Sequence, residues 1–519
     1  MIVLEVQGLT VDFPAQRVLD GVDLEVRAGE ALVVLGGSGS GKSTLLRALL
    51  GLVPAPGRVR ADRMQLRTAD GPVDLTGHAA WRGVRGREIG MVFQDPALAL
   101  TPRRVGSLVT EASGDPGRVP PLLVESGFAD PGPVAARRAF ELSGGMAQRV
   151  GFALAVAGGP RVLLADEPTT ALDGPTRDEL VNRLRERVAA GTAVVLVTHD
   201  VGVAAALADR VAVLERGRLV EHGPPAQVLG DPAHEATRAL VRDVPWALPR
   251  RSAGVRADPA APAVALRGLV KRYPGPGGPV LDGLDLQVAE GEVLGVVGRS
   301  GAGKTTLLRC LLGLERPDAG ELHLAGLDPA AAGWQAVRRR VQLVPQDPRA
   351  SLNPWRTAAQ LVADPLDFHR IGTRASRRAR ALELLGAVGL ADLAGRRPNE
   401  LSTGQCQRVA IARALAVRPR VLVADEPASA LDVTLQAEVI RLLSRVVGRS
   451  TGDEHATTAL VVSHDLHVLE RLCDRIAVLE GGRVVEDLPV ERLRADAAHP
   501  RTRALLAAHP VDPLAAVAG

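Results

Sequence analysis

Two short stretches of the sequence combine glycines with a lysine and a hydroxyl residue at a spacing suited to phosphate chemistry. They read Gly36-Gly-Ser-Gly-Ser-Gly41-Lys42-Ser43 and Gly298-Arg-Ser-Gly-Ala-Gly303-Lys304-Thr305, and both fit the pattern GxxxxGK[ST]. Each follows an apolar run typical of a strand and precedes residues typical of a helix. Glycine backbones can wrap a polyphosphate with N–H groups, and a helix N-terminus adds positive potential. The sequence therefore predicts two phosphate-binding loops.

The side chains of these loops have separate tasks. We expect Lys42 and Lys304 to contact β- and γ-phosphate oxygens, and Ser43 and Thr305 to ligate Mg²⁺. A glycine–serine turn with an incidental lysine is the alternative for one loop, but two loops with matched flanks argue against it. The other residues expected around the phosphates are Gly36, Ser38, Gly39, Gly41 and Thr44 in the first loop, and Gly298, Ser300, Gly301, Gly303 and Thr306 in the second.

Two pairs of adjacent carboxylates follow apolar runs later in the chain. Asp166 and Glu167 end the run RVLLADE, and Asp425 and Glu426 end the run RVLVADE. An aspartate at a strand end suits Mg²⁺, held directly or through water. The adjacent glutamate points the other way and can orient or deprotonate an attacking water. One such pair is commonly a solvated acidic turn, but two copies at matching positions indicate a hydrolytic site.

A third motif stands between each loop and its acid pair. It reads Leu142-Ser-Gly-Gly-Met146 in the first half and Leu401-Ser-Thr-Gly-Gln405 in the second, with the serine 24 residues before the glutamate in both. It resembles the LSGGQ signature of ABC ATPases. In that family this loop begins a helix whose N-terminus meets the γ-phosphate held by the opposite domain, and small residues allow close approach. The resemblance assigns this contact to Ser143, Gly144, Gly145, Ser402 and Gly404.

Other landmarks of that family are present in both halves. Glutamines in VFQDP and VPQDP match the Q-loop glutamine, which joins the nucleotide site to a transmembrane partner and is assigned here to catalysis and Mg²⁺. Histidines in VTHD and VSHD match the switch histidine that contacts the γ-phosphate. Aromatic residues 23 and 25 residues before the two loops match the ring that stacks on adenine, although a core role is the alternative for either ring. These residues are Gln94, Gln346, His199, His464, Phe13 and Tyr273.

The motifs recur because the chain is repeated. The segment 18–52 reappears as 280–314, and the offset is 262 residues at the loop lysines, 259 at the signature serines and the acid-pair glutamates, and 265 at the switch histidines. The segment 243–262 is rich in Pro, Ala and Arg and predicts a linker, so we expect domains at 1–242 and 263–519. Short Val- and Leu-rich runs alternate with helical stretches, which predicts an α/β fold with a mostly parallel sheet. The resemblance identifies the halves as two tandem P-loop NTPase (ABC ATPase) domains and adds a helical subdomain to each.

Composition excludes several classes of protein. The 519 residues are 46% hydrophobic and 24% charged, which is ordinary for a globular protein, and a net charge of +4 gives no argument for nucleic acid. Cys310, Cys406 and Cys473 form no CxxC pair, which argues against disulfides and zinc. No apolar run reaches the ~18–20 residues of a membrane span, and the N-terminus lacks a signal-peptide layout. We therefore expect membrane contact only through partners.

Three segments narrow the resemblance to the ATPases of the peptide/nickel importer family. They are Gln346-Asp-Pro-Arg-Ala-Ser-Leu-Asn-Pro354, the stretch LSTGQCQRVAIARAL and the tail His499-Pro-Arg-Thr-Arg-Ala-Leu-Leu506. The two halves look like the two ATPase types of that family, fused into one chain. The resemblance implies ATP and Mg²⁺ as cofactors and ATP hydrolysis coupled to import of peptides, nickel or metal complexes. It also implies two transmembrane permeases and an extracytoplasmic substrate-binding protein as partners, at the cytoplasmic face of the inner membrane. The cysteine cluster of some members is absent, so we expect no iron–sulfur site.

Family geometry implies a head-to-tail pairing in which each half contributes its signature loop to the ATP of the other. Thr403 stands where the family prefers glycine, and we expect a β-branched side chain to crowd this turn and loosen the first site. A harmless substitution is the open alternative. The main rival function is a soluble tandem ABC protein that acts on ribosomes or DNA. The short linker and the lack of cysteine pairs argue against it, and both intact acid pairs argue against a binding module without turnover.

Overall fold

The computed structural model of the chain describes every residue except 78, 96–99, 170–171, 252–261, 275–277, 300, 430, 448–455 and 516–519. Half of the predicted linker and Ser300 of the second phosphate loop thus lie outside the described residues. The chain divides into two compact units, one formed by Met1–Val244 with the chain from Val511, the other by Pro245–Pro510. Among the residues described, no helix is long and apolar enough to cross a bilayer.

An antiparallel sheet forms one layer of the first unit. Its strand order is β2-β1-β5-β6, with β4 beside β1. Along β1 and β2 buried residues tend to alternate with exposed ones, as expected for a sheet with one face on the core. The strands are β1 (Ile2–Phe13), β2 (Gln16–Arg27), β4 (Arg58–Arg60), β5 (Arg63–Thr68) and β6 (Gly71–Asp74).

The second sheet of this unit carries the chemistry-bearing loops. Its order is β11-β10-β3-β9-β8-β7, and every pair is parallel except β10 with β11. Every residue of β3, β8 and β9 is buried, and the carboxyl ends of these three neighbours meet at one edge. The strands are β3 (Ala31–Leu35), β7 (Ile89–Val92), β8 (Val162–Asp166), β9 (Ala193–Thr198), β10 (Arg210–Glu215) and β11 (Arg218–Gly223).

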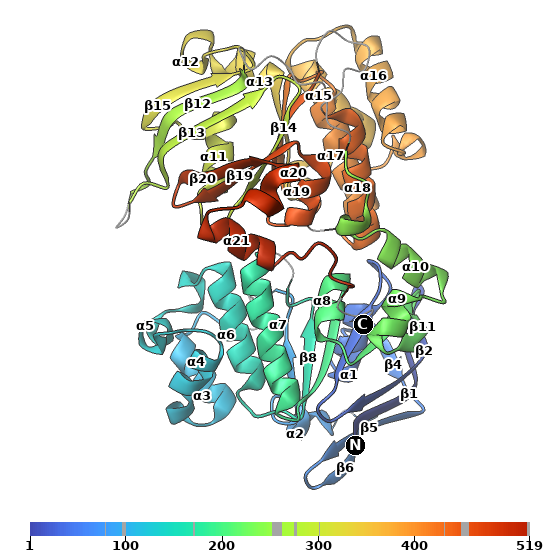
Figure 1. Cartoon of the computed structure of the whole chain (residues 1–519). Coiled ribbons are helices and arrows are strands. Elements are labelled where there is room, and N and C mark those ends of the chain that lie inside the picture. Colours follow the sequence, from blue (N-terminus) through green and yellow to red (C-terminus); the bar gives the residue numbers. More distant parts are fainter. Residues whose placement is uncertain are drawn as a thin grey trace. The chain divides into compact units, whose positions relative to one another are not determined.

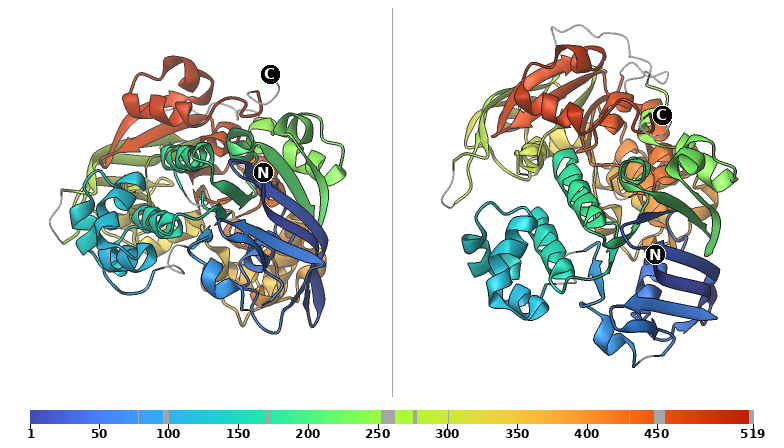
Figure 2. Two further views of the ribbon diagram at one scale, coloured as in Figure 1. Left: turned by 90° about the horizontal axis from the view of Figure 1, so that it is seen from below. Right: turned by 60° about the horizontal axis from the view of Figure 1, so that its bottom comes forward.

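The helices of the first unit fall into two groups. Helices α1, α7 and α8 flank the parallel sheet, whereas α3 to α6 gather apart from the antiparallel strands, as both views of Figure 2 show in cyan and blue. The helices are α1 (Lys42–Leu49), α2 (Trp81–Val84), α3 (Val105–Ser113), α4 (Val119–Glu125), α5 (Pro131–Ala136), α6 (Gly144–Val156), α7 (Gly174–Ala189), α8 (Val201–Leu207), α9 (Pro225–Gly230) and α10 (Glu235–Arg242).

The second unit repeats this plan, with sheets ordered β13-β12-β15 and β16-β17-β18-β14-β19-β20. Helices α15, α16 and α17 form its separate helical group (Figure 1). The predicted α/β class with mostly parallel sheets is therefore confirmed. Its strands are β12 (Pro262–Lys271), β13 (Leu281–Ala289), β14 (Val293–Val297), β15 (Ala319–Leu324), β16 (Val341–Val344), β17 (Val421–Asp425), β18 (Thr458–Val462), β19 (Arg475–Glu480) and β20 (Arg483–Pro489). Its helices are α11 (Lys304–Leu311), α12 (Pro329–Ala332), α13 (Trp334–Arg340), α14 (Pro348–Ser351), α15 (Ala358–Phe368), α16 (Arg374–Ala387), α17 (Thr403–Leu415), α18 (Val433–Val446), α19 (Leu466–Leu472), α20 (Val490–Asp496) and α21 (Pro500–Ala507).

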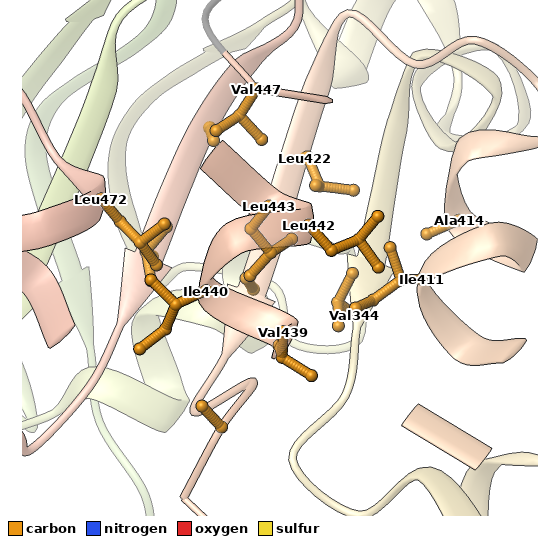
Figure 3. Close-up of a cluster of buried hydrophobic side chains, with 14 of the residues drawn as sticks. Val344, Ile411, Ala414, Leu422, Val439, Ile440, Leu442, Leu443, Val447 and Leu472 are labelled. Atoms are coloured by element: carbon orange, nitrogen blue, oxygen red, sulfur yellow. The ribbon is translucent and has the colours of Figure 1, made fainter. Parts of the chain in front are cut away.

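An aliphatic core joins the parallel sheet of the second unit to its helical group. Val344 at the end of β16, Leu422 of β17, and Ile411 and Ala414 of α17 belong to one buried cluster (Figure 3). All four side chains are at most 1% exposed. The core thus fixes α17 against the strand that leads directly to the Q-loop.

Residues 245–251 of the predicted linker pack on the second unit. Leu248 is 3% exposed and lies in the core of this unit, and the Trp246 ring centroid lies 5.3 Å from that of His467. Arg471, in α19, donates hydrogen bonds to the carbonyl oxygens of Trp246 and the residue before it. We call residues 245–251 the strap, because they lie along the helix that follows the second switch histidine.

Candidate nucleotide sites

The first phosphate loop joins β3 to α1. A Cβ on Gly36 would lie 2.4 Å from the Leu214 carbonyl oxygen, and Gly41 has a φ of 107°, so each position requires glycine. Lys42 is buried, and its Nζ donates to the carbonyl oxygens of Gly36 at 2.7 Å and Gly37 at 2.9 Å. The ammonium therefore lies across the loop whose N–H groups the sequence assigns to phosphate. Ser38 and Gly39 are exposed, and Ser43 and Thr44 are half-buried in the first turn of α1.

The second phosphate loop has the same construction between β14 and α11. A Cβ on Gly298 would lie 2.4 Å from the carbonyl oxygen of Leu479, and Gly303 has a φ of 104°. Lys304 Nζ donates to the carbonyl oxygens of Gly298 at 2.6 Å and Arg299 at 3.0 Å. Gly301 and Thr305 are exposed, and Thr306 is buried in the first turn of α11.

The strand-end aspartates lie beside the phosphate loops, and Asp166 is buried whereas Asp425 is half-buried. Ser43 Oγ donates to Asp166 Oδ1 at 2.9 Å, and Asp166 is 5% exposed. Burial raises the pKa of Asp166, and the hydrogen bond from Ser43 offsets part of that rise. Burial also raises the pKa of Asp425, and the charge of the adjacent Glu426 adds to the effect. A nearby cation would stabilise the charged form of both aspartates.

The adjacent glutamates have an unusual backbone. Glu167 has a φ of 41° and Glu426 a φ of 44°, and residues other than glycine rarely adopt such positive values. Each N–H still donates to the neighbouring strand, to the carbonyl oxygens of Val197 and Val462, both at 2.9 Å. Such positions retain about 1–3 kcal/mol of strain and gather at functional sites. The same conformation in both units marks these two residues.

The switch histidines contact these glutamates. His199 Nδ1 lies 3.0 Å from Glu167 Oε2, and His464 Nδ1 lies 3.2 Å from Glu426 Oε1. Burial lowers the pKa of each histidine, but the hydrogen bond and charge of its glutamate outweigh burial, so both pKa values are raised. Burial raises the pKa of Glu426, but His464 outweighs it and the pKa is lowered. The geometry therefore favours an imidazolium–carboxylate pair.

The Q-loop glutamines differ between the two units. Gln346 Nε2 donates to Glu426 Oε2 at 2.9 Å, so the second unit brings its glutamine, glutamate and histidine together. Gln94 is exposed and makes no hydrogen bond with another residue that the structure describes. In the first unit Lys42 Nζ lies 3.9 Å from Glu167 Oε1, and His199 contacts the same glutamate. The first unit thus brings Lys42, Glu167 and His199 together, but it does not bring Gln94 to them.

The signature serines begin helices in both units. Ser143 Oγ accepts the backbone N–H of Met146 at 3.4 Å at the start of α6. Ser402 Oγ accepts the backbone N–H of Gln405 at 3.2 Å, and the Gln405 side chain accepts the N–H of Ser402 at 2.9 Å. The second arrangement is a reciprocal capping box, which satisfies two otherwise unpaired N–H groups. Both signature loops thus end in the helix N-terminus that the sequence predicts.

Thr403 has an ordinary helical backbone. It is the first residue of α17 and has no positive φ, and a Cβ on the equivalent Gly144 would meet no atom within 4 Å. The backbone of Thr403 is therefore unstrained, and crowding of the turn against a bound nucleotide stays a prediction. Gly145 is equally open, whereas a Cβ on Gly404 would lie 2.8 Å from Leu435 Cδ1.

The two adenine candidates have different surroundings. Phe13, at the end of β1, is half-buried and packs against the core of the first unit. Tyr273 follows β12, is 39% exposed, and has Lys271 Nζ 5.6 Å from its ring centroid. Phe13 therefore has the core contacts of the alternative interpretation, and stacking on adenine stays a prediction for both rings.

Sequence reasoning missed three side chains that join the second Q-loop to α17. They are Arg349, Gln407 and Arg413. The available signal was a difference between the repeats, because alanine and leucine occupy the positions of the two arginines in the first half.

Comparison with known proteins decides the family. A family model described as ABC transporter matches the chain twice, at residues 19–170 and 281–429. The chain belongs to the ABC transporter family. It is an ATP-binding ATPase of that family, in which hydrolysis is coupled to transport, and it carries two such domains. The matched ranges include both phosphate loops, both signature motifs and both acid pairs.

Relatives of the family match almost the whole chain. The glutathione import ATP-binding protein GsiA of Salmonella typhimurium strain LT2 is 37% identical over an alignment of 568 positions, which covers 98% of this chain and 90% of that protein. The Escherichia coli K12 protein of the same name is 36% identical over 565 positions with the same coverage. The predicted resemblance to a tandem ATP-binding protein is thus confirmed. Among solved structures, the RNase-L Inhibitor matches 92% of this chain and 90% of its own with a TM-score of 0.63, and its 24% identity makes this a likeness of fold.

Proposed function

We propose that this chain is the ATP-hydrolysing subunit of an importer for glutathione, other short peptides, or the nickel and metal complexes handled by the same family. The observation that carries the proposal is the 98% coverage of the chain by a glutathione import ATP-binding protein. Both halves also retain the lysine, the acid pair and the switch histidine. In this proposal residues 1–242 and 263–519 are the two ATPase domains and 243–262 join them.

Each ATP is held by the phosphate loop of one half and the signature loop of the other. Lys42 and Lys304 bind β- and γ-phosphate oxygens, and the backbone N–H groups of the loops surround the phosphates. Glu167 and Glu426 orient the attacking water and take its proton. His199 and His464 contact the γ-phosphate and hold their glutamates in place. Positioning and charge stabilisation supply most of the catalysis.

The residues beside each phosphate loop fit Mg²⁺. Asp166 is a buried carboxylate whose pKa burial raises, and it already accepts a hydrogen bond from the Ser43 hydroxyl, the other proposed ligand. No group of three or more His, Cys, Asp or Glu suited to a metal occurs in the described part of the chain. Mg²⁺ commonly keeps water and substrate phosphate oxygens as ligands, and these would supply the rest of its coordination when nucleotide is bound. Asp425 and Thr305 would have these roles in the second half, with Gln94 and Gln346 as further candidate ligands. When bound, Mg²⁺ neutralises charge on the phosphates.

The partners are two transmembrane permeases and an extracytoplasmic substrate-binding protein. The chain lies at the cytoplasmic face of the membrane and reaches it only through the permeases, with no nucleic acid involved. The rival function on ribosomes or DNA gains nothing from the RNase-L Inhibitor, because that likeness at 24% identity concerns the fold alone.

Uptake measurements test the proposal. The chain is co-expressed with the permeases and binding protein encoded beside it, and uptake of radiolabelled glutathione and of a dipeptide is followed. We expect ATP-dependent uptake and co-purification with both permeases, and background uptake with Lys42→Ala/Lys304→Ala at equal expression. Sedimentation with ribosomes, without uptake or bound permease, would overturn the proposal.

A further inference from the structure

Arg349 links the second Q-loop to the second signature loop. It lies in α14, three residues after Gln346. Its guanidinium donates to the carbonyl oxygens of Leu401 at 2.5 Å and Pro398 at 3.4 Å, and to Thr403 Oγ1 at 3.4 Å. A planar guanidinium can hold several acceptors at fixed angles, which a lysine cannot. This one side chain therefore contacts both the approach to α17 and its first turn.

Two side chains of α17 reach back to the Q-loop. Gln407 is 2% exposed, and its Nε2 donates to the carbonyl oxygen of Pro345 at 3.4 Å. Arg413 donates to the carbonyl oxygen of Ser351 at 2.8 Å and to its Oγ at 3.3 Å. The bonds hold the two ends of segment 345–351, and Arg349 holds its middle.

The apolar contacts beneath these bonds make the connection stiff. Ile411 and Ala414 of α17 pack toward Val344, the residue before segment 345–351 (Figure 3). Packed interiors transmit displacement because they hold few voids. The polar contacts thus extend an interface that is already close-packed.

Among the residues that the structure describes, the first half connects its signature helix to a different segment. Gln148 is the equivalent of Gln407, but its Nε2 donates to the carbonyl oxygen of Pro168, directly after Glu167, at 3.0 Å. Leu154 and Ala97 occupy the sequence positions of Arg413 and Arg349, and neither residue type has a side-chain donor. Ala97 lies outside the described residues.

We propose that Arg349, Gln407 and Arg413 form a clasp that makes the second Q-loop and the second signature helix move as one body. In the described part of the first half, Gln148 joins the signature helix to the residue that follows the acid pair. The three clasp residues are positioning residues that act on Ser402 and Gly404 through α17. The clasp rests on the proposed function in one respect only. In that function a permease is the partner that exerts force on the Q-loop.

The clasp is tested with the double variant Arg349→Ala/Arg413→Leu, which gives the second half the residues of the first. Hydrogen–deuterium exchange is measured on the full chain, in a Glu167→Gln/Glu426→Gln background, with and without ATP and Mg²⁺. We expect amides of 345–351 to exchange at least tenfold faster in the variant, while 401–407 keeps its ATP-dependent protection. Peptide 142–148 of the first half is expected to be unchanged.

Two further variants keep the result decisive. Arg380→Ala removes a guanidinium from α16, where it pairs with Glu383, and serves as the matched control. Arg349→Lys alone replaces the double variant if that one fails to fold. With active glutamates, we expect the clasp variants to lower kcat about three- to tenfold with an unchanged KM for ATP, because the phosphate loops are untouched.

Exchange at 345–351 that stays coupled to 401–407 in the clasp variants would overturn the proposal, as would an equal effect of Arg380→Ala. Because every readout needs only ATP, a negative uptake experiment would leave this result standing. A result that overturns the clasp would likewise leave the transport proposal standing.

Discussion

The two halves of the chain hold their hydrolytic glutamates alike and their signature helices differently. The glutamate φ angles are 41° and 44°, and the histidine–glutamate distances are 3.0 and 3.2 Å. Gln148 and Gln407 occupy equivalent positions, yet one bonds beside the acid pair and the other beside the Q-loop. The comparison teaches that phosphate chemistry constrains a few positions tightly, while the connections among the surrounding segments can differ between the two halves.

The helices after the switch histidines differ in the same way. In the second unit α19 is covered by the strap through Trp246 and Arg471. In the first unit α8 receives the side chain of Arg185 at the Ala206 carbonyl oxygen. The helix that follows the switch histidine thus has a different neighbour in each half, and the halves are not interchangeable.

Removal of each glutamate in turn gives the largest expected effect and tests whether the halves hydrolyse ATP equally. General-base catalysis contributes about 10²–10⁴-fold, so Glu167→Gln/Glu426→Gln together should lower kcat at least about 100-fold. We expect Glu426→Gln to lose more activity than Glu167→Gln, because the second unit already gathers Gln346, Glu426 and His464. ATPase rates of the full chain measure this, with ATP binding as the control. Equal losses would show that the difference in assembly has no catalytic consequence.

Truncation of a buried side chain in the strap tests whether this segment belongs to the second unit. Leu248→Ala removes a side chain that is 3% exposed and should destabilise that unit by about 2–4 kcal/mol. Differential scanning calorimetry and hydrogen exchange should show earlier unfolding of α19 with an unchanged first unit. Leu314→Ala is the matched control, since that leucine is 64% exposed and should change stability by less than about 0.5 kcal/mol. Equal destabilisation of both units would contradict the assignment.

The sequence predicts the chemistry of this chain better than its connections. The phosphate loops, acid pairs and switch histidines are short local patterns, and parallel strands with buried runs bring them to one edge. The clasp joins Arg349 to Leu401, 52 residues away, so no local pattern announces it. The strap was hidden in a Pro- and Arg-rich segment that reads as a linker. The effect of Thr403 on the first site stays a prediction, because the helical backbone of this residue does not show what its side chain faces when ATP is bound.

Exchange of the signature residues between halves sharpens the comparison at a smaller scale. Thr403→Gly removes an acceptor of Arg349 at 3.4 Å, and Gly144→Thr adds a side chain where nothing lies within 4 Å. Each change should cost less than about 1 kcal/mol of stability, since glycine in a helix costs about that much. We expect kcat changes below about fivefold for both variants. A loss of kcat above 100-fold in either variant would show that this turn is crowded, with the crowding located between the halves.

The smallest expected effect concerns pH and the histidine–glutamate pairs. The pKa of His464 is raised by Glu426, so the folded chain binds this proton more tightly than the unfolded chain. The resulting stabilisation is complete below the ordinary histidine pKa of about 6.5 and is lost as pH rises through the raised value. The lowered pKa of Glu426 acts in the opposite direction: its contribution is present above the ordinary glutamate value and is lost as pH falls through the lowered one. Between pH 6 and 8 the histidine therefore decides whether stability rises or falls with pH, and we expect its contribution to fall as pH rises.

His464→Gln should accordingly lower Tm more at pH 6 than at pH 8 when nucleotide is absent. One kcal/mol corresponds to about 2–4 °C in a unit of this size. His199→Gln is the matched variant, because the pKa of His199 is raised by Glu167 in the same way. The same pH dependence in both would show that the charged pair is common to the halves, whose differences then lie in the clasp and the strap. A drop in Tm that does not vary with pH would mean that the histidine packs as a neutral ring, and the ion pair would have to be abandoned for that half.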